Sequence, residues 1–210
     1  MTQEQEKVSK EQLILEAAEY EFFTKGFAGA RTTSIAERAG VTHAMLHYYY
    51  RTKEQLFERV VEKNATTIGQ TMLAAMGNPA IPIIERLRDG ISAHFDLIVA
   101  HPLLPRFFLN EIVAYPERYS MLTDNLGTTA NKLFSELQCE ANAAFERGEI
   151  EQVDVRMLFL SMLSLNIFPF VVYPFGQKIM SDIMGDKESF LERRKAENIE
   201  LIIRRIKKQQ

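Results

Sequence analysis

A glycine between two very short helical segments is the feature that most constrains this chain. Residues 31–53 read RTTSIAERAGVTHAMLHYYYRTK, and Ala39-Gly40-Val41 separates one expected helix from a second that runs only to about Tyr48. Glycine adopts the positive φ that such a tight turn often needs, whereas a side chain there would be strained. The pattern predicts a helix-turn-helix motif, whose second helix enters the major groove of DNA by its N-terminus.

Apolar and capping residues in this stretch fit two short helices held at a fixed angle. The residues expected to form their small core are Ile35, Ala36, Ala39, Val41 and Leu46. Thr33 or Ser34 can cap the first helix and Thr42 the second, because a hydroxyl oxygen accepts a hydrogen bond from a free backbone N–H. Thr52, with Gln55 three residues later, predicts the start of a longer helix.

Helical periodicity continues along the rest of the chain. A first helix is expected to begin near Ser9 and to end at Gly26. After the breaker run Gly77-Asn78-Pro79, apolar-periodic segments follow near 81–100, 103–120, 123–147, 151–173 and 180–207. We predict an all-α fold of about nine helices. Residues 1–55 form a three-helix helix-turn-helix DNA-binding domain, and residues 56–210 form a larger helical ligand-binding and dimerisation domain.

The composition is that of a soluble globular protein. Of the 210 residues, 46% are hydrophobic and 25% charged, which is enough for a core and excludes a disordered or fibrous chain. The net charge of −3 means that any surface for nucleic acid is a local patch. The single Cys139 excludes an internal disulfide, and the polar N-terminus does not resemble a secretory signal. We expect a cytoplasmic protein.

Residues 157–177 could suggest a membrane span, because they carry no charged side chain and are long enough to cross a bilayer. Ser161, Ser164 and Asn166 interrupt this segment, as do two prolines. We interpret it as a helix buried in a core or a subunit interface, since a helix that is apolar on all sides is buried in either case. No membrane partner is expected.

The stretch from Ile14 to Leu56 resembles the DNA-binding domain of the TetR (tetracycline-repressor-like) family of bacterial transcriptional regulators. The matching residues keep their spacing without a gap and are Ile14, Leu15, Ala17, Ala18, Phe22, Gly26, Phe27, Thr32, Thr33, Ile35, Ala36, Ala39, Gly40, Val41, Leu46, Tyr49, Tyr50, Lys53, Glu54 and Leu56. The match covers about a fifth of the chain. Nothing after about residue 75 is identified by a motif.

The resemblance implies a set of DNA-contacting side chains. They are Thr33, Ser34, Thr42, His43, Ala44, His47, Tyr48, Tyr49 and Lys53. Hydroxyls and backbone N–H groups at the start of a helix can hold a phosphate, which suits the first two. His47 stands where the family usually has tyrosine, and Glu21 stands where it usually has leucine. Tyr50 replaces a common inward-facing phenylalanine and is expected in the core.

The expected interface is only weakly basic. Residues 31–63 hold six lysines and arginines against four glutamates, a net charge of +2. His43 and His47 lie four residues apart, which is also a metal-ligand spacing, but the recognition helix has no cysteine or carboxylate beside them, so we predict no metal. We hypothesise instead that protonation of these histidines places positive charge near phosphate and tightens operator binding below neutral pH.

The second half is expected to hold a small apolar ligand. Nine methionines and fourteen phenylalanines in the chain suit an adaptable cavity, since methionine fills irregular space. The candidate lining residues are His94, Phe95, Phe107, Phe108, Phe134, Met162, Asn166 and Phe170, each of which could equally be an ordinary core residue. The resemblance further implies a homodimer in which the last two helices form a four-helix bundle. Residues 157–177 and the apolar residues Phe190, Ile199, Ile202, Ile203 and Ile206 would supply its surface.

These observations predict a sequence-specific DNA-binding transcriptional regulator, namely a ligand-responsive dimeric repressor that binds a palindromic operator in double-stranded DNA. No cofactor and no enzymatic activity are expected. Asp96, Glu111, Glu117 and Asp124 are interpreted as solvated because no nucleophile, phosphate loop or cofactor motif accompanies them. Two alternatives stay open: an all-helical carrier of apolar ligands, and a protein-interaction module, neither of which binds DNA.

Overall fold

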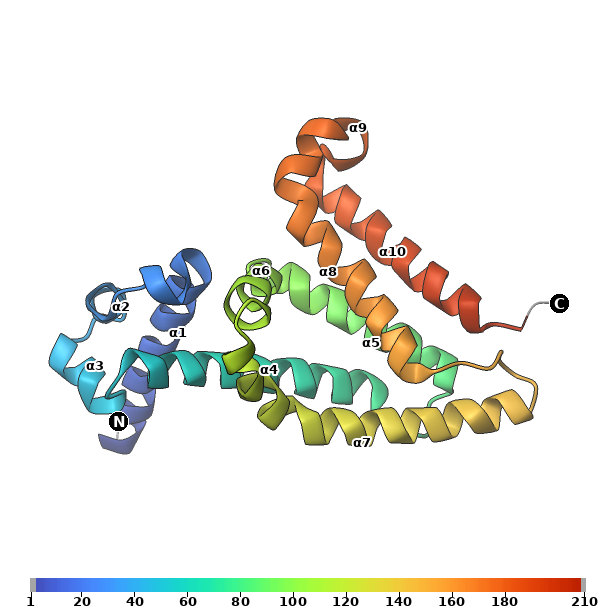
Figure 1. Ribbon diagram of the computed structural model, residues 1–210, viewed down its shortest axis with the longest axis horizontal. Helices are drawn as coiled ribbons and strands as arrows, with labels where there is room; N and C mark the ends of the chain where they lie inside the picture. Colours follow the sequence, from blue (N-terminus) through green and yellow to red (C-terminus); the bar gives the residue numbers. More distant parts are fainter. Residues whose placement is uncertain (1–2, 209–210) are drawn as a thin grey trace. The chain divides into compact units, whose positions relative to one another are not determined.

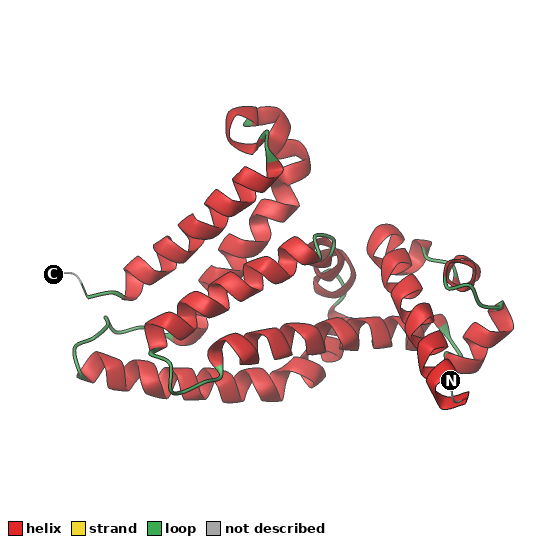
Figure 2. Ribbon diagram, turned by 180° about the vertical axis from the view of Figure 1, so that it is seen from behind, coloured by secondary structure: helices red, strands yellow, loops and turns green. Residues whose placement is uncertain are grey.

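The protein is all-α in a computed structural model that describes residues 3–208, with side chains described at 10–124 and 126–208 (Figure 1). Its α-helices are α1 (Gln3–Gly29), α2 (Thr32–Arg38), α3 (His43–Tyr49), α4 (Lys53–Met76), α5 (Ile83–Ala100), α6 (Leu104–Phe108), α7 (Tyr119–Glu146), α8 (Val155–Ile179), α9 (Ser181–Met184) and α10 (Lys187–Ile206). A π-helical segment, η1 (Leu109–Val113), and a 3-10 turn, η2 (Pro116–Arg118), precede α7. Residues 3–208 contain no strand, as Figure 2 shows.

The predicted all-α class is confirmed, but the chain is divided into more pieces than expected. The segment predicted at 103–120 is split into α6, η1 and η2, and the break before η2 falls at Pro116, which lacks the N–H that a continuing helix needs. The segment predicted at 180–207 is split into α9 and α10, and Asp186 caps α10 by accepting from the Glu188 N–H. The first helix begins at Gln3 rather than near Ser9, whose side chain lies outside the described residues.

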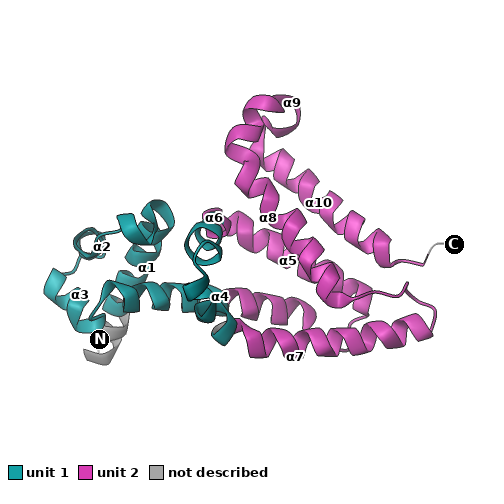
Figure 3. Ribbon diagram, in the orientation of Figure 1, with its two compact units in different colours: residues 1–66, 106–125 teal, residues 67–105, 126–210 magenta. Residues whose placement is uncertain are grey.

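The chain forms two compact units, coloured separately in Figure 3. The first combines Met1–Thr66 with Arg106–Asn125, and the second combines Thr67–Pro105 with Leu126–Gln210. Helices α4 and α7 therefore each contribute residues to both units. The functional boundary that the sequence suggests after residue 55 stays a prediction.

The core of the first unit brings α1 to α4 together with a segment from much later in the chain. Ile14, Phe22, Ile35 and Leu46 are buried there, and Phe107 from the later segment joins them. Gly26 has φ +69° and ψ 173°, so it interrupts α1 as the sequence predicts. Glu21, which replaces the leucine usual in the family, is buried in this helix and pairs with Lys25 at 2.8 Å.

A charged cluster fixes the later segment against α1. The carboxylate of Glu111 lies where a side chain on Gly26 would be, so a larger residue would have to displace it in addition to adopting the positive φ of this position. Arg118 donates to that carboxylate and to the Glu111 carbonyl, both at 2.8 Å. Its guanidinium also lies over the rings of Phe27 and Phe57, at 4.9 and 5.0 Å from their centres. Ion pair and cation–π contacts thus act on the same arginine.

The second unit packs α5, α8 and α10 together and completes its core with α7 and the end of α4. Arg86 is buried and stabilises this arrangement because it donates to the Met76 carbonyl at 2.7 Å and pairs with Glu140. Met76 also packs directly over Gly90, where a larger residue would clash with its thioether.

Helix α8 has two different faces. Asp154 caps it by accepting from the N–H groups of Arg156 and Met157 at 2.8 and 3.2 Å. The helix is long and apolar enough to cross a membrane, with a mean hydropathy of 1.8, but only 28% of its most apolar window is buried within the chain. One face enters the core of the second unit. The residues exposed on the other face are Met157, Leu160, Ser161, Ser164, Phe168, Val171 and Phe175.

We predict that Gly40 and Gly127 respond oppositely to alanine. Nothing lies within 4 Å of a Cβ at either position, so space does not distinguish them. Gly40 has φ +66°, which costs an L residue about 1–2 kcal/mol, so Gly40→Ala lowers the free energy of unfolding by that amount. Gly127 lies inside α7, where alanine is the better helix former by about 0.8–1.0 kcal/mol, so Gly127→Ala raises it. Urea denaturation measures both, and a stabilised Gly40→Ala protein would contradict the turn geometry.

Candidate nucleic-acid interface

The turn between α2 and α3 is a Schellman motif. The Val41 N–H donates to the Ala36 carbonyl at 3.0 Å, and the Gly40 N–H donates to the Glu37 carbonyl at 3.1 Å. This pair of bonds satisfies the last carbonyls of α2 and requires the left-handed conformation that Gly40 supplies. The turn therefore fixes the direction in which the chain leaves α2 and enters α3.

Helix α3 is held by its cap and by two inward-facing side chains. The Oγ1 atom of Thr42 accepts from the Met45 N–H at 3.2 Å, which confirms the predicted cap. Leu46 is fully buried, and Tyr50, directly after the helix, is buried as predicted. Burial, followed by the nearby Glu11 carboxylate, raises the pKa of Tyr50 to about 12, so this ring stays uncharged in the core.

The outer face of α3 is exposed, as the helix-turn-helix interpretation requires. The exposed residues are Thr42, His43, Ala44, His47 and Tyr48. Tyr48 is the most prominent, with 71% of its surface exposed. Tyr49 is half-buried against the core of the first unit and meets Tyr48 edge to face, with ring centres 5.5 Å apart. The side chains proposed to contact DNA therefore point outward from a rigidly anchored helix.

The start of α2 differs from the prediction. Arg31, rather than Thr33 or Ser34, occupies the cap position, and no side-chain bond caps this helix. Thr33 is exposed and Ser34 half-exposed in the first turn, where their hydroxyls and the backbone N–H groups can approach a phosphate. Lys53 lies at the start of α4 as expected, with its Nζ atom 4.7 Å from the centre of the Phe27 ring.

The two histidines of α3 form a hydrogen-bonded chain that the sequence did not reveal. Their Nε2 atoms are 3.2 Å apart, and the His43 Nε2 atom is also 3.0 Å from the hydroxyl of Thr32. The His47 Nδ1 atom is 3.3 Å from the Arg51 carbonyl, which only accepts, so we assign a hydrogen to Nδ1. The hydrogen on the His43 Nε2 atom is then shared between two acceptors, the His47 Nε2 atom and the Thr32 hydroxyl oxygen.

Sequence reasoning missed three residues at this surface. Thr32 orients His43 through the bond just described. Arg31 and Arg51 are exposed at the start of α2 and just after α3, so both present positive charge beside the recognition helix. Their positions next to the two predicted helix ends are the signal that could have identified them.

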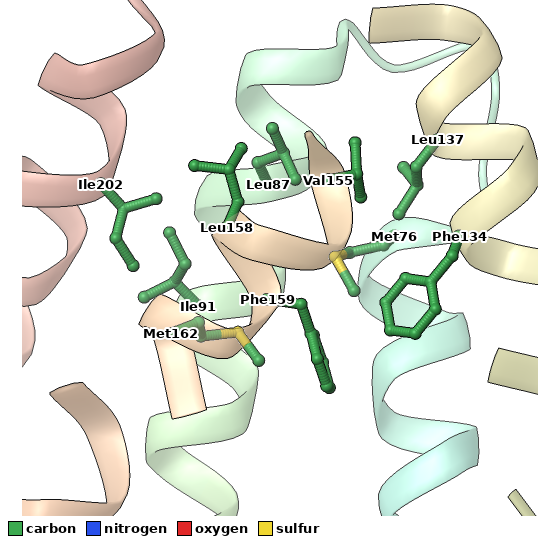
Figure 4. A pocket seen from close by; sticks show the side chains of 10 residues that line it. All are labelled: Met76, Leu87, Ile91, Phe134, Leu137, Val155, Leu158, Phe159, Met162 and Ile202. Carbon is green, nitrogen blue, oxygen red and sulfur yellow. The ribbon is translucent and has the colours of Figure 1, made fainter. Parts of the chain in front are cut away.

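The predicted ligand residues lie in different parts of the structure and do not surround one cavity. Phe134 and Met162 line an apolar cavity in the second unit, together with Met76, Leu87, Ile91, Leu137, Val155, Leu158, Phe159 and Ile202 (Figure 4). The cavity is small, with a volume of about 20 Å³. Phe95 and Phe170 contact each other in the second unit, at 5.4 Å between ring centres. Phe107 and Phe108 instead pack in the first unit.

His94 and Asn166 are buried and bonded to each other, and neither lines the cavity. Burial lowers the pKa of His94 to about 4. Two of the carboxylates considered in the sequence are paired: Asp96 with Lys195 at 2.6 Å and Glu111 with Arg118 at 2.8 Å. Within the described part of the chain, no group of three or more metal-ligating side chains is brought together.

A short helix with an exposed polar face, anchored after a Schellman turn, defines a helix-turn-helix DNA-binding protein. Residues 14–60 match the family model described as bacterial regulatory proteins, tetR family. The match covers the N-terminal helix-turn-helix region and confirms the resemblance predicted there, so this region is similar to the DNA-binding part of transcriptional regulators of this family.

One curated protein is similar in sequence, and two solved structures are similar in fold. The chain is 33% identical over 102 residues to the HTH-type transcriptional repressor SCO4008 of Streptomyces coelicolor, and the alignment spans 49% of each protein. A bacterial regulatory protein of the tetR family from Rhodococcus RHA1 has a similar fold, with a TM-score of 0.72 and 20% identity over 96% of this chain and 98% of that one. The transcriptional regulator FadR from Bacillus subtilis, in complex with stearoyl-CoA, has a TM-score of 0.67 and 17% identity over 92% and 98%.

Proposed function

We propose that this protein is a cytoplasmic, dimeric repressor that binds a palindromic operator through α3 of each subunit and releases it when a small apolar ligand binds in the helical unit. The observation that carries the proposal is the exposed outer face of α3 on a helix fixed by the Gly40 turn and by Leu46. Two such helices would occupy successive major grooves about 34 Å apart, which requires a two-fold symmetric site.

The chemistry of the exposed face supports contact with both grooves and phosphates. Imidazole and phenol groups on His43, His47 and Tyr48 can form hydrogen bonds with base edges or phosphate oxygens. The methyl group of Ala44 suits an apolar contact with the methyl group of thymine. The modest net charge of +2 over residues 31–63 implies a small salt dependence per subunit, so much of the affinity would come from neutral contacts and from binding as a pair.

The exposed face of α8 supports dimerisation. Residues 157, 161, 164, 168, 171 and 175 are spaced alternately by four and three, the spacing of a helix-pairing seam, and none is charged. Phe168 is 64% exposed at its centre. The residues expected from α10 contribute less, which corrects the sequence interpretation: Phe190, Ile202, Ile203 and Ile206 are buried within the chain itself, and Leu201 is the apolar residue left exposed in that part of the helix.

The apolar cavity supports a ligand-responsive mechanism. Its walls carry two methionines, which can change rotamer to admit a guest larger than the present volume. SCO4008 is named as a repressor, and FadR was solved with stearoyl-CoA, so relatives of this chain provide precedents for both roles. A ligand releases DNA only to the extent that it binds the non-binding conformation more tightly than the DNA-binding one.

We predict that Tyr48→Ala weakens operator binding by about tenfold or more while leaving the fold intact. The ring is exposed, so its removal opens no cavity, but each subunit loses a contact worth about 1 kcal/mol. The gel-shift assay uses the DNA upstream of the protein's own gene, at low salt, with unrelated DNA as competitor. Phe145→Ala, which removes an exposed aromatic ring from α7, is the matched control and should bind like the unmodified protein. If the unmodified protein gives no sequence-dependent shift, the proposed function is wrong.

We predict that Phe168→Glu converts the dimer to a monomer. Two glutamates facing each other across the two-fold axis would be desolvated without a partner, which should raise the dimer dissociation constant by about 100-fold or more. Sedimentation equilibrium measures this constant. Val99→Glu, on an exposed apolar residue of α5, is the control and should leave the dimer intact. A dimer that survives Phe168→Glu and dissociates in the control would place the interface elsewhere.

A further inference from the structure

Three polar side chains meet inside the second unit, one from each of α5, α8 and α10. They are His94, Asn166 and Asn198, and both asparagines are completely buried. The first two are among the ligand residues expected from the sequence, whereas Asn198 is not. Polar groups enclosed in a core destabilise it unless they are paired, so each of their atoms needs a hydrogen-bond partner.

The hydrogen bonds within this cluster leave one buried polar atom without a partner. Asn166 Nδ2 donates to the Ile91 carbonyl at 3.0 Å and to His94 Nδ1 at 3.2 Å. Asn198 Nδ2 donates to the Leu165 carbonyl at 2.9 Å and to Asn166 Oδ1 at 3.0 Å. All four amide hydrogens are used, which also fixes the orientation of both amides. The Oδ1 atom of Asn198 is buried and has no partner.

The cluster carries no charge at neutral pH. His94 Nδ1 accepts from an amide that only donates, so its single hydrogen lies on Nε2. Burial lowers the pKa of His94 to about 4, so the ring is neutral well below pH 7. A group that meets this cluster therefore encounters an uncharged imidazole and an unused carbonyl oxygen.

The polar cluster lies directly beside the apolar cavity. Ile91, Met162 and Ile202 line that cavity, one from each of the same three helices (Figure 4). Each is three or four residues from the polar member of its own helix, hence on the same face and about one turn away. The cavity and the cluster therefore lie about one helical turn apart in the space between α5, α8 and α10.

Among the described residues, no charged side chain lines the cavity, so the cavity offers no cation to an acidic ligand. All ten side chains that line the cavity are apolar. Arg86 precedes the cavity residue Leu87 and is buried, but its guanidinium already donates to the Met76 carbonyl and pairs with the Glu140 carboxylate. A carboxylate brought to the cluster would face the Asn198 oxygen without compensation, so the site disfavours anions.

We propose that the cavity and the polar cluster form a single site for an uncharged, mostly apolar compound that bears a hydroxyl or amide hydrogen, with Asn198 Oδ1 accepting that hydrogen. The proposal rests on the proposed ligand-responsive function and defines the class of its ligand. The apolar part enters by displacing flexible side chains of the cavity, chiefly Met76 and Met162. Asn198 is the residue that selects for a donor.

Two isomeric probes test this selection. 1-Octanol and 1-methoxyheptane contain the same atoms, but only the alcohol has a hydrogen to donate. Isothermal titration of the full-length protein, without DNA, should show 1-octanol binding about tenfold more tightly, the effect of one satisfied buried acceptor. Octanoate, tested at pH 7.5, should bind at least about tenfold more weakly than the alcohol. Equal affinity for alcohol and ether, tighter binding of octanoate, or no binding of 1-octanol would overturn the proposal.

Variants separate the cluster from the cavity. Asn198→Leu should lose the preference for alcohol over ether, whereas Asn131→Leu, the same change at an exposed asparagine, should keep it. Ile202→Phe fills the cavity without touching the polar cluster and should abolish binding of both probes. This variant tests whether the probes bind in the cavity even if Asn198→Leu does not fold. Preserved preference in a folded Asn198→Leu protein, or unchanged binding in Ile202→Phe, would contradict the assignment.

A negative result in these titrations can be distinguished from a failure of the proposed function. Operator binding is measured on the unmodified protein without any probe, so loss of the gel shift would refute the regulator and leave the titration result standing. Conversely, a positive gel shift combined with equal binding of the two isomers would retain the regulator and reject this class of ligand.

Discussion

Burial of Leu46 is the interaction on which the DNA-facing surface depends. Helix α3 has only seven residues, too few for a helix to be stable in isolation, so its stability comes from the tertiary contacts of its inner face. Leu46 is fully buried, Thr42 caps the N-terminus and the Gly40 turn fixes the approach. Once these three positions are set, the 3.6-residue period places the remaining side chains outward. The same physics makes the surface tolerant of different outer residues, because none of them holds the helix in place.

Much of this surface could be predicted because its causes are local. The glycine of the positive-φ turn, the capping threonine and the apolar anchor all lie within residues 40–46, and their chemistry is visible in the sequence. The His43–His47 pair and the bond to Thr32 were not predictable in the same way, since spacing indicates that two rings can meet but not which hydrogen-bond chain they form. The predicted cap of α2 was wrong for a related reason: Thr33 and Ser34 could both serve, and Arg31 precedes them.

The least predictable part of the fold is the assignment of residues 106–125 to the first unit. Their partners are distant in sequence: Glu111 packs over Gly26, and Arg118 reaches the rings of Phe27 and Phe57. Apolar periodicity reports which face of a segment is buried but not against which helix. The phenylalanines at 107 and 108 were for this reason expected beside a ligand, although they complete the core around α1 and α4. The chain thus places a segment between α5 and α7 within the DNA-binding unit, and α7 supplies residues to both units.

Helix α8 takes part in both properties proposed for the second unit, ligand binding and dimerisation. One of its faces contacts the core and the opposite face is exposed. Leu158, Met162 and Asn166 point into the core, at the cavity and at the polar cluster. Phe168 and Val171 lie on the exposed stripe proposed to pair with a second subunit. Pro169 and Pro174 each remove one backbone hydrogen bond from this helix. A guest large enough to push α8 away from α5 and α10 would nevertheless shift its opposite, exposed stripe as well. Ligand binding would then be coupled to the geometry of the dimer, and so to the spacing of the two recognition helices, without any additional moving element.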